Sequence, residues 1–376
     1  MAKNNKPILF PTFLTNALHK RTAEKSLRVL KTDYPLIDFS SNDYLGFSTL
    51  GLLQQEVQRL KPSIKIGSTG SRLISGNSKL FQEVETNIAN FHHSESALIF
   101  NSGYDANLGL LSCVPQKGDL ILSDELMHAS LIDGIRLGYA TCYKFKHNAV
   151  EALEALLVRH KGSFKEIYIV VESVYSMDGD CAPLKAYVEL CHKYQAHLIV
   201  DEAHAIGVFG TKGKGLCNEL NIEEECFARI YTYGKAMGCH GASVVGSEEL
   251  KNYLINFSRS FIYTTAMPEH SLLAIKAAYQ LLEHTNQIEL LKKNSEYFNS
   301  KSNLSNTFIQ STSAIHCKIV SGNEQVQLVE EACWRKNLFI KSIKSPTVKE
   351  GQERIRICLH SYNTIEQIDI LLGFLA

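Results

Sequence analysis

The feature that most constrains the fold is an alternation of short apolar runs with amphipathic stretches between about residues 95 and 246. Each run is apolar at successive positions, so both faces of the strand that it predicts would be buried. The stretches at 150–160 and 185–195 carry apolar residues at helical spacing. A sheet buried on both faces and covered by helices is parallel or mixed, which predicts an α/β fold. The runs are "SALIF" (96–100), "DLILS" (119–123), "EIYIVVES" (166–173), "HLIVDEAH" (197–204) and "ASVVGS" (242–247).

The C-terminal part of the chain has a different pattern. After a long helical region near 269–293, three strand-like runs are separated by a helical stretch: "SAIHCKIV" (313–320), "NLFIKSI" (337–343) and "RIRICL" (354–359). This pattern is typical of a small α+β domain, and we expect the N-terminal helix, at about 12–30, to join it. The sequence therefore predicts a large domain over 45–280 and a small domain formed by 1–44 and 281–376.

Charge and cysteine usage limit the possible functions. The 39 lysines and arginines equal the 39 aspartates and glutamates, so no basic field would attract nucleic acid or an anionic membrane. The ten cysteines are dispersed and form no C-x-x-C pair, which is typical of a reducing compartment. No secretory leader or apolar stretch of bilayer length is recognisable. We expect a cytoplasmic protein with a small-molecule partner, and neither nucleic-acid binding nor a membrane span.

The segment "TYGKAMGCHGASVV" (232–245) places a single lysine, Lys235, among small and apolar residues. No aspartate or glutamate occurs between Cys226 and Ser247. Because burial favours the neutral form of an amine, this environment would lower the pKa of Lys235. A neutral lysine amine is a nucleophile and can later act as a base, so the segment is a candidate catalytic site.

Acidic residues end two of the predicted strands. Glu172 ends one, Asp201 and Glu202 end another, and His204 follows shortly after. In an open α/β sheet, ligands bind beyond the carboxyl ends of the strands. These acids could equally cap the helices that follow. A metal site is another interpretation, but the spacing matches no strong ligand motif, and we expect no metal.

"DEAH" could also be the magnesium-binding acid pair of a nucleotide-driven helicase. Such an enzyme needs a G-x-x-x-x-G-K-[ST] loop, and the glycines and lysines of "GTKGKG" (210–215) lack the Ser or Thr and follow the acidic strand. Pyridoxal phosphate (PLP) chemistry explains more of these features together. It needs a lysine amine for a Schiff base, an aspartate against the pyridine nitrogen and helix-terminal donors for the phosphate.

Several motifs in consistent order carry a resemblance to a known family. "VDEAHAIGVFG" is followed, 34 residues after Asp201, by Lys235 in "TYGKAMG". The chain resembles the α-oxoamine synthases among the fold-type I PLP-dependent transferases, over roughly residues 20–360. The resemblance implies a mostly parallel central sheet covered by helices plus a small α+β domain. The other matching segments are "SSNDYLGFS", "GSTGSRLISGN", "ALIFNSGYDAN", "SDELMHASLIDGIRLG", "ESVYSMDGDCAPL", "FIYTTAMPE" and "RIRICLH".

The resemblance implies a role for particular residues. Lys235 would form the Schiff base, Asp201 would pair with the pyridine nitrogen, His204 would contact the phenolic oxygen and His128 would stack on the ring. With these four, the implied cofactor-binding set contains Ser102, Gly103, Tyr104, Glu172, Ser176, Thr232 and Thr265. The implied substrate-binding set is Arg21, Asn42, His128, Thr347 and Arg356, with Arg356 binding the amino-acid carboxylate. Thr265 would reach the phosphate of a neighbouring subunit, which implies a homodimer with shared active sites.

Some of these assignments have alternatives. His128 could be an ordinary histidine at a helix start, and Arg354 shares a strand face with Arg356, so either could bind a carboxylate. Two residues depart from the family pattern. Phe81 stands where a histidine is common, and Gly234 stands where many relatives carry a serine, which removes one possible phosphate hydroxyl.

The implied reaction is a decarboxylative condensation of a small amino acid, L-alanine or glycine, with an acyl-CoA or acyl-carrier-protein thioester. The G-[ST]-x-G-S-R-L stretch is most similar to the members that use L-alanine and a pimeloyl thioester in biotin synthesis. Glycine C-acetyltransferase, 5-aminolevulinate synthase and serine palmitoyltransferase types could use the same residues. An aminotransferase of the same fold is a further alternative, and would exchange keto acids without consuming a thioester.

Overall fold

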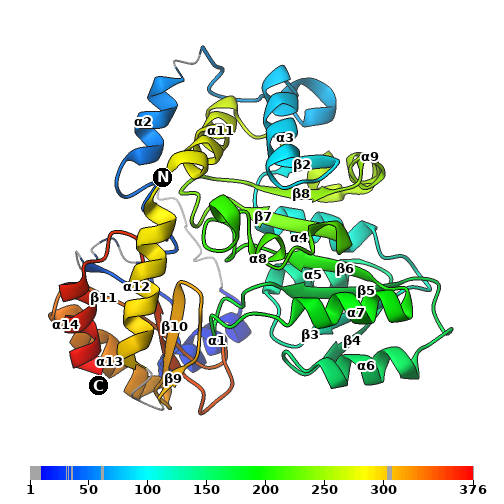
Figure 1. Cartoon of the computed structure of the whole chain (residues 1–376). Helices are drawn as coiled ribbons and strands as arrows, with labels where there is room; N and C mark the ends of the chain where they lie inside the picture. The colour runs from blue at the N-terminus through cyan, green and yellow to red at the C-terminus, as the bar shows by residue number, and fades with distance from the viewer. Residues whose placement is uncertain are drawn as a thin grey trace, which may run out of the picture.

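The computed structural model describes residues 10–30, 32, 34, 37–60, 63–302 and 307–375. Its centre is a seven-stranded sheet in the order β2-β8-β7-β6-β5-β3-β4 (Figure 1). β8 is antiparallel to both of its neighbours, and the pairs from β7 to β4 are parallel. The strands are β2 (Ser96–Phe100), β3 (Leu120–Asp124), β4 (Thr141–Phe145), β5 (Ile167–Glu172), β6 (His197–Asp201), β7 (Cys226–Thr232) and β8 (Ala242–Gly246).

All five strands predicted for this sheet are present, and the mostly parallel α/β architecture is confirmed. β4 and β7 were not among the predicted strands. β4 lies at the sheet edge and is largely exposed, so it lacks a continuous apolar run. β7 contains a charged residue, Arg229, which interrupts its apolar run. The guanidinium is buried, and it donates to the Tyr231 hydroxyl at 3.0 Å and to the His92 carbonyl at 2.8 Å.

Helices cover both faces of the sheet, and alternate residues of each strand face opposite sides. In β5, Ile169 and Val171 pack in one core cluster, whereas Tyr168 and Val170 pack in another. The first cluster contains α6 (Val150–Arg159), α7 (Leu184–Tyr194) and α8 (Leu216–Glu219). The second contains α4 (Gly103–Cys113), α5 (Ala129–Leu137), α9 (Glu248–Phe257) and α10 (Arg259–Ile262).

A third core cluster joins the sheet to the C-terminal part of the chain. It includes residues of α2 (Leu52–Arg59), α3 (Lys79–Phe91), α11 (Glu269–His284) and α12 (Gln287–Ser302). The helical region predicted near 269–293 is confirmed, although it is divided between two helices and the second continues to Ser302. The helix is interrupted at Thr285, which has an extended backbone. Its hydroxyl accepts a hydrogen bond from the Gln287 backbone N–H at 3.1 Å.

The C-terminal part forms a four-stranded antiparallel sheet, in the order β12-β13-β10-β9, with two helices. These elements are β9 (Phe308–Ile309), β10 (Ile315–Ile319), β12 (Lys341–Ile343), β13 (Arg354–Cys358), α13 (Asn323–Arg335) and α14 (Ile365–Leu375). A further parallel pair joins β1 (Ile37–Asp38) to β11 (Leu338–Phe339). The three predicted runs are thus strands, although 337–343 is divided between β11 and β12.

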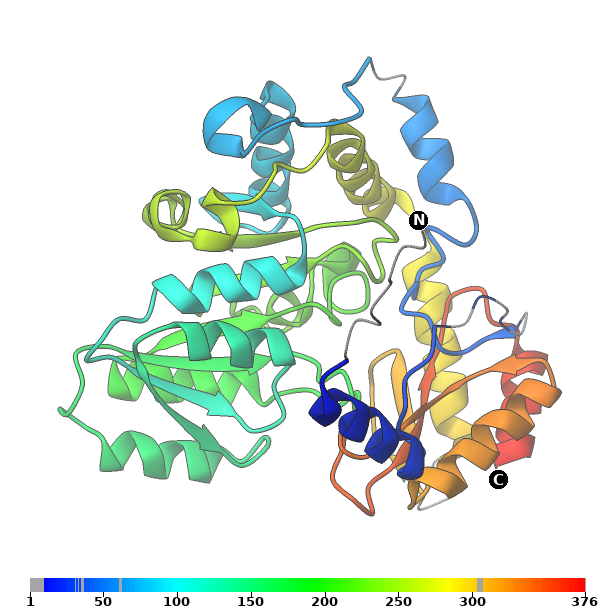
Figure 2. The same ribbon diagram turned by 180° about the vertical axis from the view of Figure 1, so that it is seen from behind.

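The N-terminal helix α1 (Thr12–Ala23) lies beside this small sheet (Figure 2). The Asn323 side chain donates to the Glu24 carbonyl at 3.0 Å, and the Lys344 ammonium donates to the Lys25 carbonyl at 2.8 Å. The helix ends at Ala23, earlier than the predicted 12–30. The domain division over 45–280 remains our proposal. In the proposed small domain, residues 1–9, 31, 33, 35–36, 303–306 and 376 lie outside the described residues. In the described part of the chain, no helix combines the length and apolarity needed to cross a bilayer.

Candidate active site

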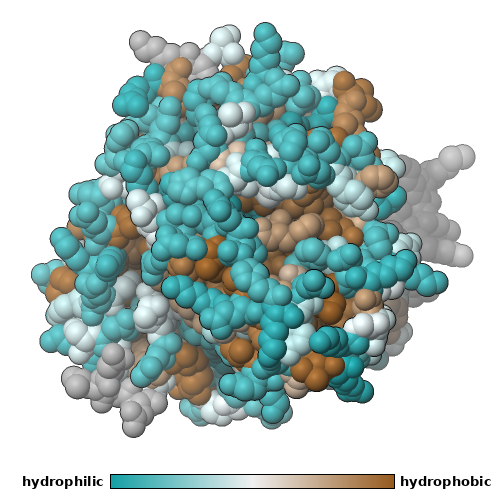
Figure 3. Space-filling model, turned by 45° about the vertical axis from the view of Figure 1, so that its right-hand side comes forward, coloured by the Kyte–Doolittle hydropathy of each residue, from teal (hydrophilic) through white to brown (hydrophobic). Residues whose placement is uncertain are grey.

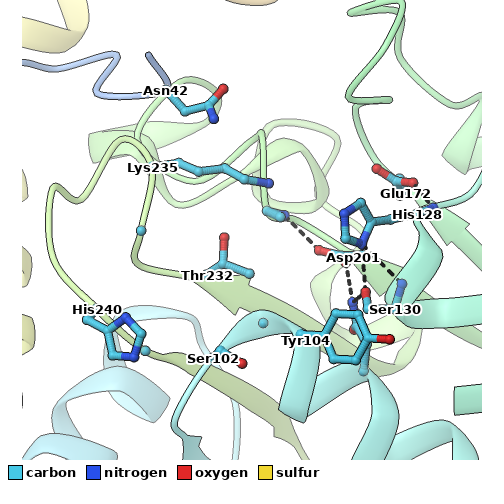
Figure 4. A pocket seen from close by; sticks show the side chains of 15 residues that line it. Asn42, Ser102, Tyr104, His128, Ser130, Glu172, Asp201, Thr232, Lys235 and His240 are labelled. Atoms are coloured by element: carbon cyan, nitrogen blue, oxygen red, sulfur yellow. Dashed lines mark hydrogen bonds between the residues drawn. The ribbon is translucent and has the colours of Figure 1, made fainter. Parts of the chain in front are cut away.

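A cavity of about 260 Å³ lies at the carboxyl ends of β5, β6 and β7 (Figure 4). The position follows from the topology, because the carboxyl ends of parallel strands meet at one edge of a sheet. Among the residues that the sequence suggested, nine line this cavity: Asn42, Ser102, Gly103, Tyr104, His128, Glu172, Asp201, Thr232 and Lys235.

The amine of Lys235 lies 2.8 Å from Nε2 of His204. The Tyr44 hydroxyl lies 2.7 Å from Nδ1 of the same imidazole and donates to Oδ1 of Asn42 at 3.0 Å. Because this hydroxyl gives its proton to Asn42, its oxygen accepts from His204 Nδ1–H. Nε2 is then the acceptor that faces Lys235. Burial, together with the charges of Lys235 and Arg356, lowers the pKa of His204, which keeps the ring neutral as this pattern requires.

Burial also lowers the pKa of Lys235 to about 8, although the negative charges of Asp201 and Glu172 oppose the shift. The direction agrees with the expectation drawn from the acid-free segment. The sequence did not reveal that β5 and β6 bring two carboxylates close to the amine in space. A lysine with this pKa is neutral in a useful fraction near neutral pH, so it can act as a nucleophile and a base.

Asp201 is buried and has a partner on each oxygen. Oδ2 accepts from the Asn107 side-chain amide at 2.7 Å, and Oδ1 accepts from the Ala203 backbone N–H at 2.9 Å. The capping interpretation is wrong for Asp201, because a turn and not a helix follows it, and the carboxylate lines the cavity. Glu202 is different, because its carboxylate accepts from the Leu216 and Cys217 amides, at 2.9 and 2.7 Å, and so caps α8.

His128 combines both roles that the sequence left open. It caps α5, with Nδ1 close to the Ser130 hydroxyl at 2.7 Å, and it also lines the cavity. Its backbone N–H donates to Glu172 Oε1 at 2.5 Å. Burial, reinforced by the charge of Asp201, raises the pKa of Glu172 to about 8, so this carboxyl is protonated in much of the population at neutral pH.

The N-terminus of α4 and the end of β7 form a cradle with unused hydrogen-bond donors. Ser102 caps α4 by accepting from the Asp105 amide at 3.1 Å, and the amides of Gly103 and Tyr104 open the helix. Such first-turn amides have no intrahelical partner and attract anions. The buried Thr232 hydroxyl has no hydrogen-bond partner among the described residues. A Cβ on Gly103 would lie 2.4 Å from Thr232 Cγ2, so glycine keeps this approach open.

These groups fit the cofactor that the sequence resemblance implies. PLP needs an amine, a carboxylate that keeps its pyridine nitrogen protonated, and donors for a phosphate. Lys235, Asp201 and the cradle at Ser102, Gly103 and Thr232 supply them around one cavity. The orphaned Thr232 hydroxyl supports the fit, because a buried hydroxyl without a partner costs free energy unless a ligand satisfies it.

The two arginines of β13 have different surroundings. Arg354 forms an ion pair with Asp178. Arg356 donates to the Ser176 carbonyl at 2.7 Å and to Asn42 Oδ1 at 3.0 Å. Within the described ranges it forms no ion pair with a carboxylate, although it is buried. A buried guanidinium without a carboxylate partner can bind the carboxylate of a ligand.

Six predicted residues do not line this cavity. Two of them contact residues that do line it, His204 through Lys235 and Arg356 through Asn42, and the other four lie elsewhere. Ser176 and Thr347 line a larger cavity of about 1210 Å³, which shares His128 with the smaller one. Arg21 of α1 lines other hollows, next to Pro346. Thr265 is exposed. Its backbone carbonyl accepts from the side-chain amide of Asn101, the residue before Ser102, at 2.9 Å.

Sequence reasoning missed four residues of the site: Tyr44, Asn107, Ser130 and His240. Asn107, Ser130 and His240 line the cavity, and Tyr44 contacts His204. The first three lie inside the quoted motifs "SSNDYLGFS", "ALIFNSGYDAN" and "SDELMHASLIDGIRLG", and His240 lies inside "TYGKAMGCHGASVV". Polar residues within these motifs were the signal that could have identified them.

The two departures from the family pattern have different environments. Phe81 is buried under the guanidinium of Arg72, whose Cζ lies 3.9 Å from the ring centroid, and does not line the cavity. Gly234 does line it, and a Cβ built there would meet only the Cys239 carbonyl oxygen, at 3.7 Å. The site therefore has room for a serine at position 234.

The family model described as aminotransferase class I and II matches residues 34–375. The chain is 40% identical to 8-amino-7-oxononanoate synthase of Emericella nidulans, over 90% of this chain and 88% of that protein. A solved 8-amino-7-oxononanoate synthase from Francisella tularensis is 31% identical, with a TM-score of 0.76, over 90% of this chain and 96% of that one. Serine palmitoyltransferase from S. paucimobilis, solved with a bound PLP–myriocin aldimine, is 25% identical, with a TM-score of 0.87, over 96% and 95% of the two chains.

A relative this similar over this much of the chain shares its family, and the geometry of the cavity agrees with that relationship. The chain therefore belongs to the aminotransferase class I and II family of PLP-dependent enzymes, and within it to the α-oxoamine synthases that its motifs resemble.

Proposed function

We propose that this chain is an 8-amino-7-oxononanoate synthase of biotin biosynthesis. It joins L-alanine to a pimeloyl thioester and releases carbon dioxide and the free thiol. The observation that carries the proposal is the convergence of Lys235, Asp201 and an anion cradle on one cavity beside the buried Arg356. The names of relatives that are 37–40% identical over most of the chain support the choice of substrates.

In this proposal Lys235 would hold PLP, Asp201 would pair with the pyridine nitrogen, His128 would contact the ring, and the cradle at Ser102 and Thr232 would bind the phosphate. When bound, PLP supplies an electron sink for the α-carbon of the amino acid. The Lys235 amine, with a pKa near 8, removes the α-proton and later returns a proton to the product. His204 accepts a hydrogen bond from this amine and so directs its lone pair.

Arg356 binds the amino-acid carboxylate. Two contacts restrict the guanidinium, one to the Ser176 carbonyl and one to Asn42 Oδ1. Because Asn42 also accepts from Tyr44, which contacts His204, one hydrogen-bonded chain connects the carboxylate-binding group with the base. This arrangement holds the α-carbon between Arg356 and Lys235, and proximity of this kind lowers the barrier to proton transfer.

The acyl thioester enters through the larger cavity, of about 1210 Å³, that adjoins His128. Its apolar lining suits a hydrocarbon chain, and includes Leu126, Ile132, Ile309, Ile319 and Val348. Thr347 lies on the same wall, and Arg21 lies in a neighbouring hollow that shares Ser345 and Pro346. These two residues would contact the polar part of the thioester, carried on coenzyme A or on a carrier protein.

We propose a homodimer in which Thr265 reaches the phosphate site of the partner. Large apolar side chains are exposed close to Thr265 in sequence or in the fold, among them Tyr263, Leu73 and Ile74, at 73%, 53% and 84%. Brown apolar areas are also visible among hydrophilic side chains on the face drawn in Figure 3. Apolar surface of this kind often marks an interface. The dispersed, unpaired pattern of cysteines supports a cytoplasmic location.

Mixing two inactive variants tests the shared site. Lys235→Ala and Thr265→Asp, which repels the phosphate, should together restore activity through hybrid dimers. Random exchange makes half of the dimers hybrids with one intact site each, so activity should return to about a quarter of wild type. An enzyme that sediments as a fully active monomer would exclude the shared site.

Two measurements test the proposed function. Borohydride treatment of the yellow protein should leave one phosphopyridoxyl group on the Lys235 peptide. A thiol-release assay should then cross alanine, glycine and serine with acetyl, succinyl, pimeloyl and palmitoyl thioesters. We expect the highest kcat/KM with alanine and the pimeloyl thioester. Amino-group exchange with keto acids and no thiol release would indicate an aminotransferase instead.

Serine palmitoyltransferase chemistry is the second candidate, since solved enzymes of that name match over 96% of this chain with TM-scores of 0.87 and 0.88. The higher sequence identity to 8-amino-7-oxononanoate synthases favours the first proposal. The serine and palmitoyl arms of the same assay separate the two candidates.

A further inference from the structure

His147 lies between two carboxylates that come from different segments. Its Nδ1 is 3.0 Å from Oδ1 and 3.1 Å from Oδ2 of Asp124, and its Nε2 is 2.7 Å from Oδ2 of Asp180. Asp124 is fully buried, and the ring of Tyr175 packs edge-on against the imidazole at 4.4 Å. Both ring nitrogens lie within hydrogen-bond distance of a carboxylate, and the Asn148 side-chain amide lies further from Nε2, at 3.3 Å. Donation to both carboxylates requires the charged imidazolium. We call His147, Asp124 and Asp180 the His147 clamp.

The electrostatics of the clamp agree with its geometry. Burial alone would lower the pKa of His147, but hydrogen bonds to Asp124 and Asp180 outweigh it and raise the pKa to about 9. The surface pair of His192 and Glu225 differs from the clamp. His192 is exposed, and only its Nε2 contacts a carboxylate, at 2.7 Å. The His147 clamp therefore joins two parts of the chain through a half-buried imidazolium and the buried Asp124 carboxylate, which the exposed His192–Glu225 pair does not do.

Asp124 connects the clamp to the segment that contains His128. Asp124 ends β3, and its Oδ1 accepts from the Leu126 amide at 2.8 Å, which starts the turn over 125–128. Its Oδ2 accepts from the Asn148 amide at 2.9 Å. The clamp thus fixes the start of the segment that delivers His128 to the cavity.

The Asp180 side leads to Arg356 through the turn over 175–180. The Asp180 carbonyl accepts from the Tyr175 amide at 3.0 Å, which closes this turn. In the same turn, the Ser176 carbonyl accepts a hydrogen bond from the Arg356 guanidinium at 2.7 Å. The same turn is therefore contacted by His147, in the loop that follows β4, and by β13 of the small sheet. The Asn148 side-chain amide also donates to Asp180 Oδ2, at 2.7 Å.

We propose that His147 is a positioning residue that sets the guanidinium of Arg356 for the substrate carboxylate by holding the turn over 175–180. The inference rests on the proposed function, because it assigns the carboxylate to Arg356. His147 lines the larger cavity but touches neither the Lys235 amine nor the groups proposed to hold PLP. An effect that passes through Asp180 and the Ser176 carbonyl should appear in carboxylate binding alone, whereas an effect that passes through Asp124 and His128 should weaken both ligands of the test below.

The decisive experiment compares two ligands on PLP-loaded protein. L-Alanine carries the carboxylate, and L-alaninol is the same amine without it. In His147→Gln, we expect L-alanine to bind about tenfold more weakly, as for a displaced positioning group, and L-alaninol to bind as in wild type. His192→Gln is the matched control and should leave both affinities unchanged. Unchanged L-alanine binding in folded His147→Gln, or equal losses for both ligands, would overturn the proposal.

A measurement without amino acid provides a second readout. Amide hydrogen exchange of the peptide covering 175–180 should accelerate in His147→Gln and stay unchanged in His192→Gln. If His147→Gln does not fold, Asp180→Asn keeps the size of that side chain and weakens the clamp, and we expect a loss of about threefold in L-alanine affinity. Wild-type exchange and affinity in Asp180→Asn would equally contradict the proposal.

A double mutant tests the route. In an Arg356→Lys background, adding His147→Gln should cause no further loss of L-alanine affinity, since both changes act on one interaction. Additive losses would show that His147 does not act through Arg356. A failure of the proposed function can be told apart from a failure of this inference. It would appear as an absence of thiol release in the wild-type enzyme, whatever the ratio of the L-alanine and L-alaninol affinities.

Discussion

The two halves of the candidate site are built in different ways. The cofactor half uses the ends of neighbouring strands in one sheet, where Glu172, Asp201 and Thr232 end β5, β6 and β7. The substrate half is assembled around Arg356, whose hydrogen bonds reach residues 180 and 314 positions away in the chain. The first half depends on the pairing of strands, and the second depends on how two sheets pack.

This difference predicts how the halves respond to mutation. Strand pairing places the carboxyl ends of parallel strands at one edge, so each side chain of the cofactor half can be altered alone. In the substrate half, a change in the turn over 175–180 or in β13 should move several groups together. Changes in the cofactor half should therefore affect the chemical step, and changes in the substrate half should affect amino-acid affinity.

The largest expected effect is in the cofactor half, at Asp201. Asp201→Asn should fold and bind PLP, because the asparagine oxygen can still accept from the Ala203 amide, at the cost of the Asn107 hydrogen bond. The neutral side chain cannot keep the pyridine nitrogen protonated, so activity should fall at least about a thousandfold. The measurements are α-proton exchange of L-alanine in deuterated solvent by NMR, and thermal melting. Wild-type exchange in the folded variant would show that the Asp201 carboxylate is only structural, with Glu172 the next residue to test.

The two arginines of β13 test the substrate half. Arg356→Ala should weaken L-alanine binding by more than about tenfold, since truncating one partner of a buried guanidinium–carboxylate pair costs about 2–5 kcal/mol. Arg354→Ala breaks the ion pair with Asp178 and should lower stability by about 1–3 kcal/mol, with a smaller effect on affinity. Binding titrations and urea unfolding separate the two effects. Equal losses of affinity in both variants would remove the distinction between them.

The pH dependence of stability tests the burial of Lys235 in protein freed of PLP. The pKa of Lys235 in the folded state is about 8, below its usual 10.5, so the unfolded chain binds more protons between these values. Stability should rise from pH 8 to pH 10.5, by about 3 kcal/mol from this group. Urea unfolding of Lys235→Met should lack that rise. Glu172, with a raised pKa of about 8, acts in the opposite direction and mainly below pH 8. Identical pH profiles for wild type and Lys235→Met would contradict the shift.

The smallest expected effect is at Gly234. Gly234→Ser should fit without strain, because the nearest non-neighbouring atom to a new Cβ is the Cys239 carbonyl oxygen at 3.7 Å. The added hydroxyl should tighten PLP binding by a few-fold, as expected for one hydrogen bond worth about 1 kcal/mol. Fluorescence titration of the PLP-free protein measures this, with Gly234→Ala as the control that adds volume without a donor. Equal affinities for the two variants would show that the serine does not reach the phosphate.

Much of the fold could be predicted from local pattern. Runs apolar on both faces identified five strands of the main sheet, and those in "EIYIVVES" and "HLIVDEAH" end with acids at the sheet edge. The missed strands show the limit. β7 contains Arg229, whose charge is tolerated only because tertiary partners satisfy it, and β4 is an exposed edge.

The sequence by itself determined the α/β architecture, the segments that carry Lys235, Asp201 and the α4 cradle, and the expectation of a lowered lysine pKa. These depend on residue type, periodicity and strand ends, which are local properties. Only the tertiary structure separated Arg356 from Arg354, because Asp178 pairs with one and leaves the other without an acid partner among the described residues. Only it brought His147 between Asp124 and Asp180. Such contacts join residues that are distant in the chain, and their geometry is decided by how the two sheets pack rather than by any one segment.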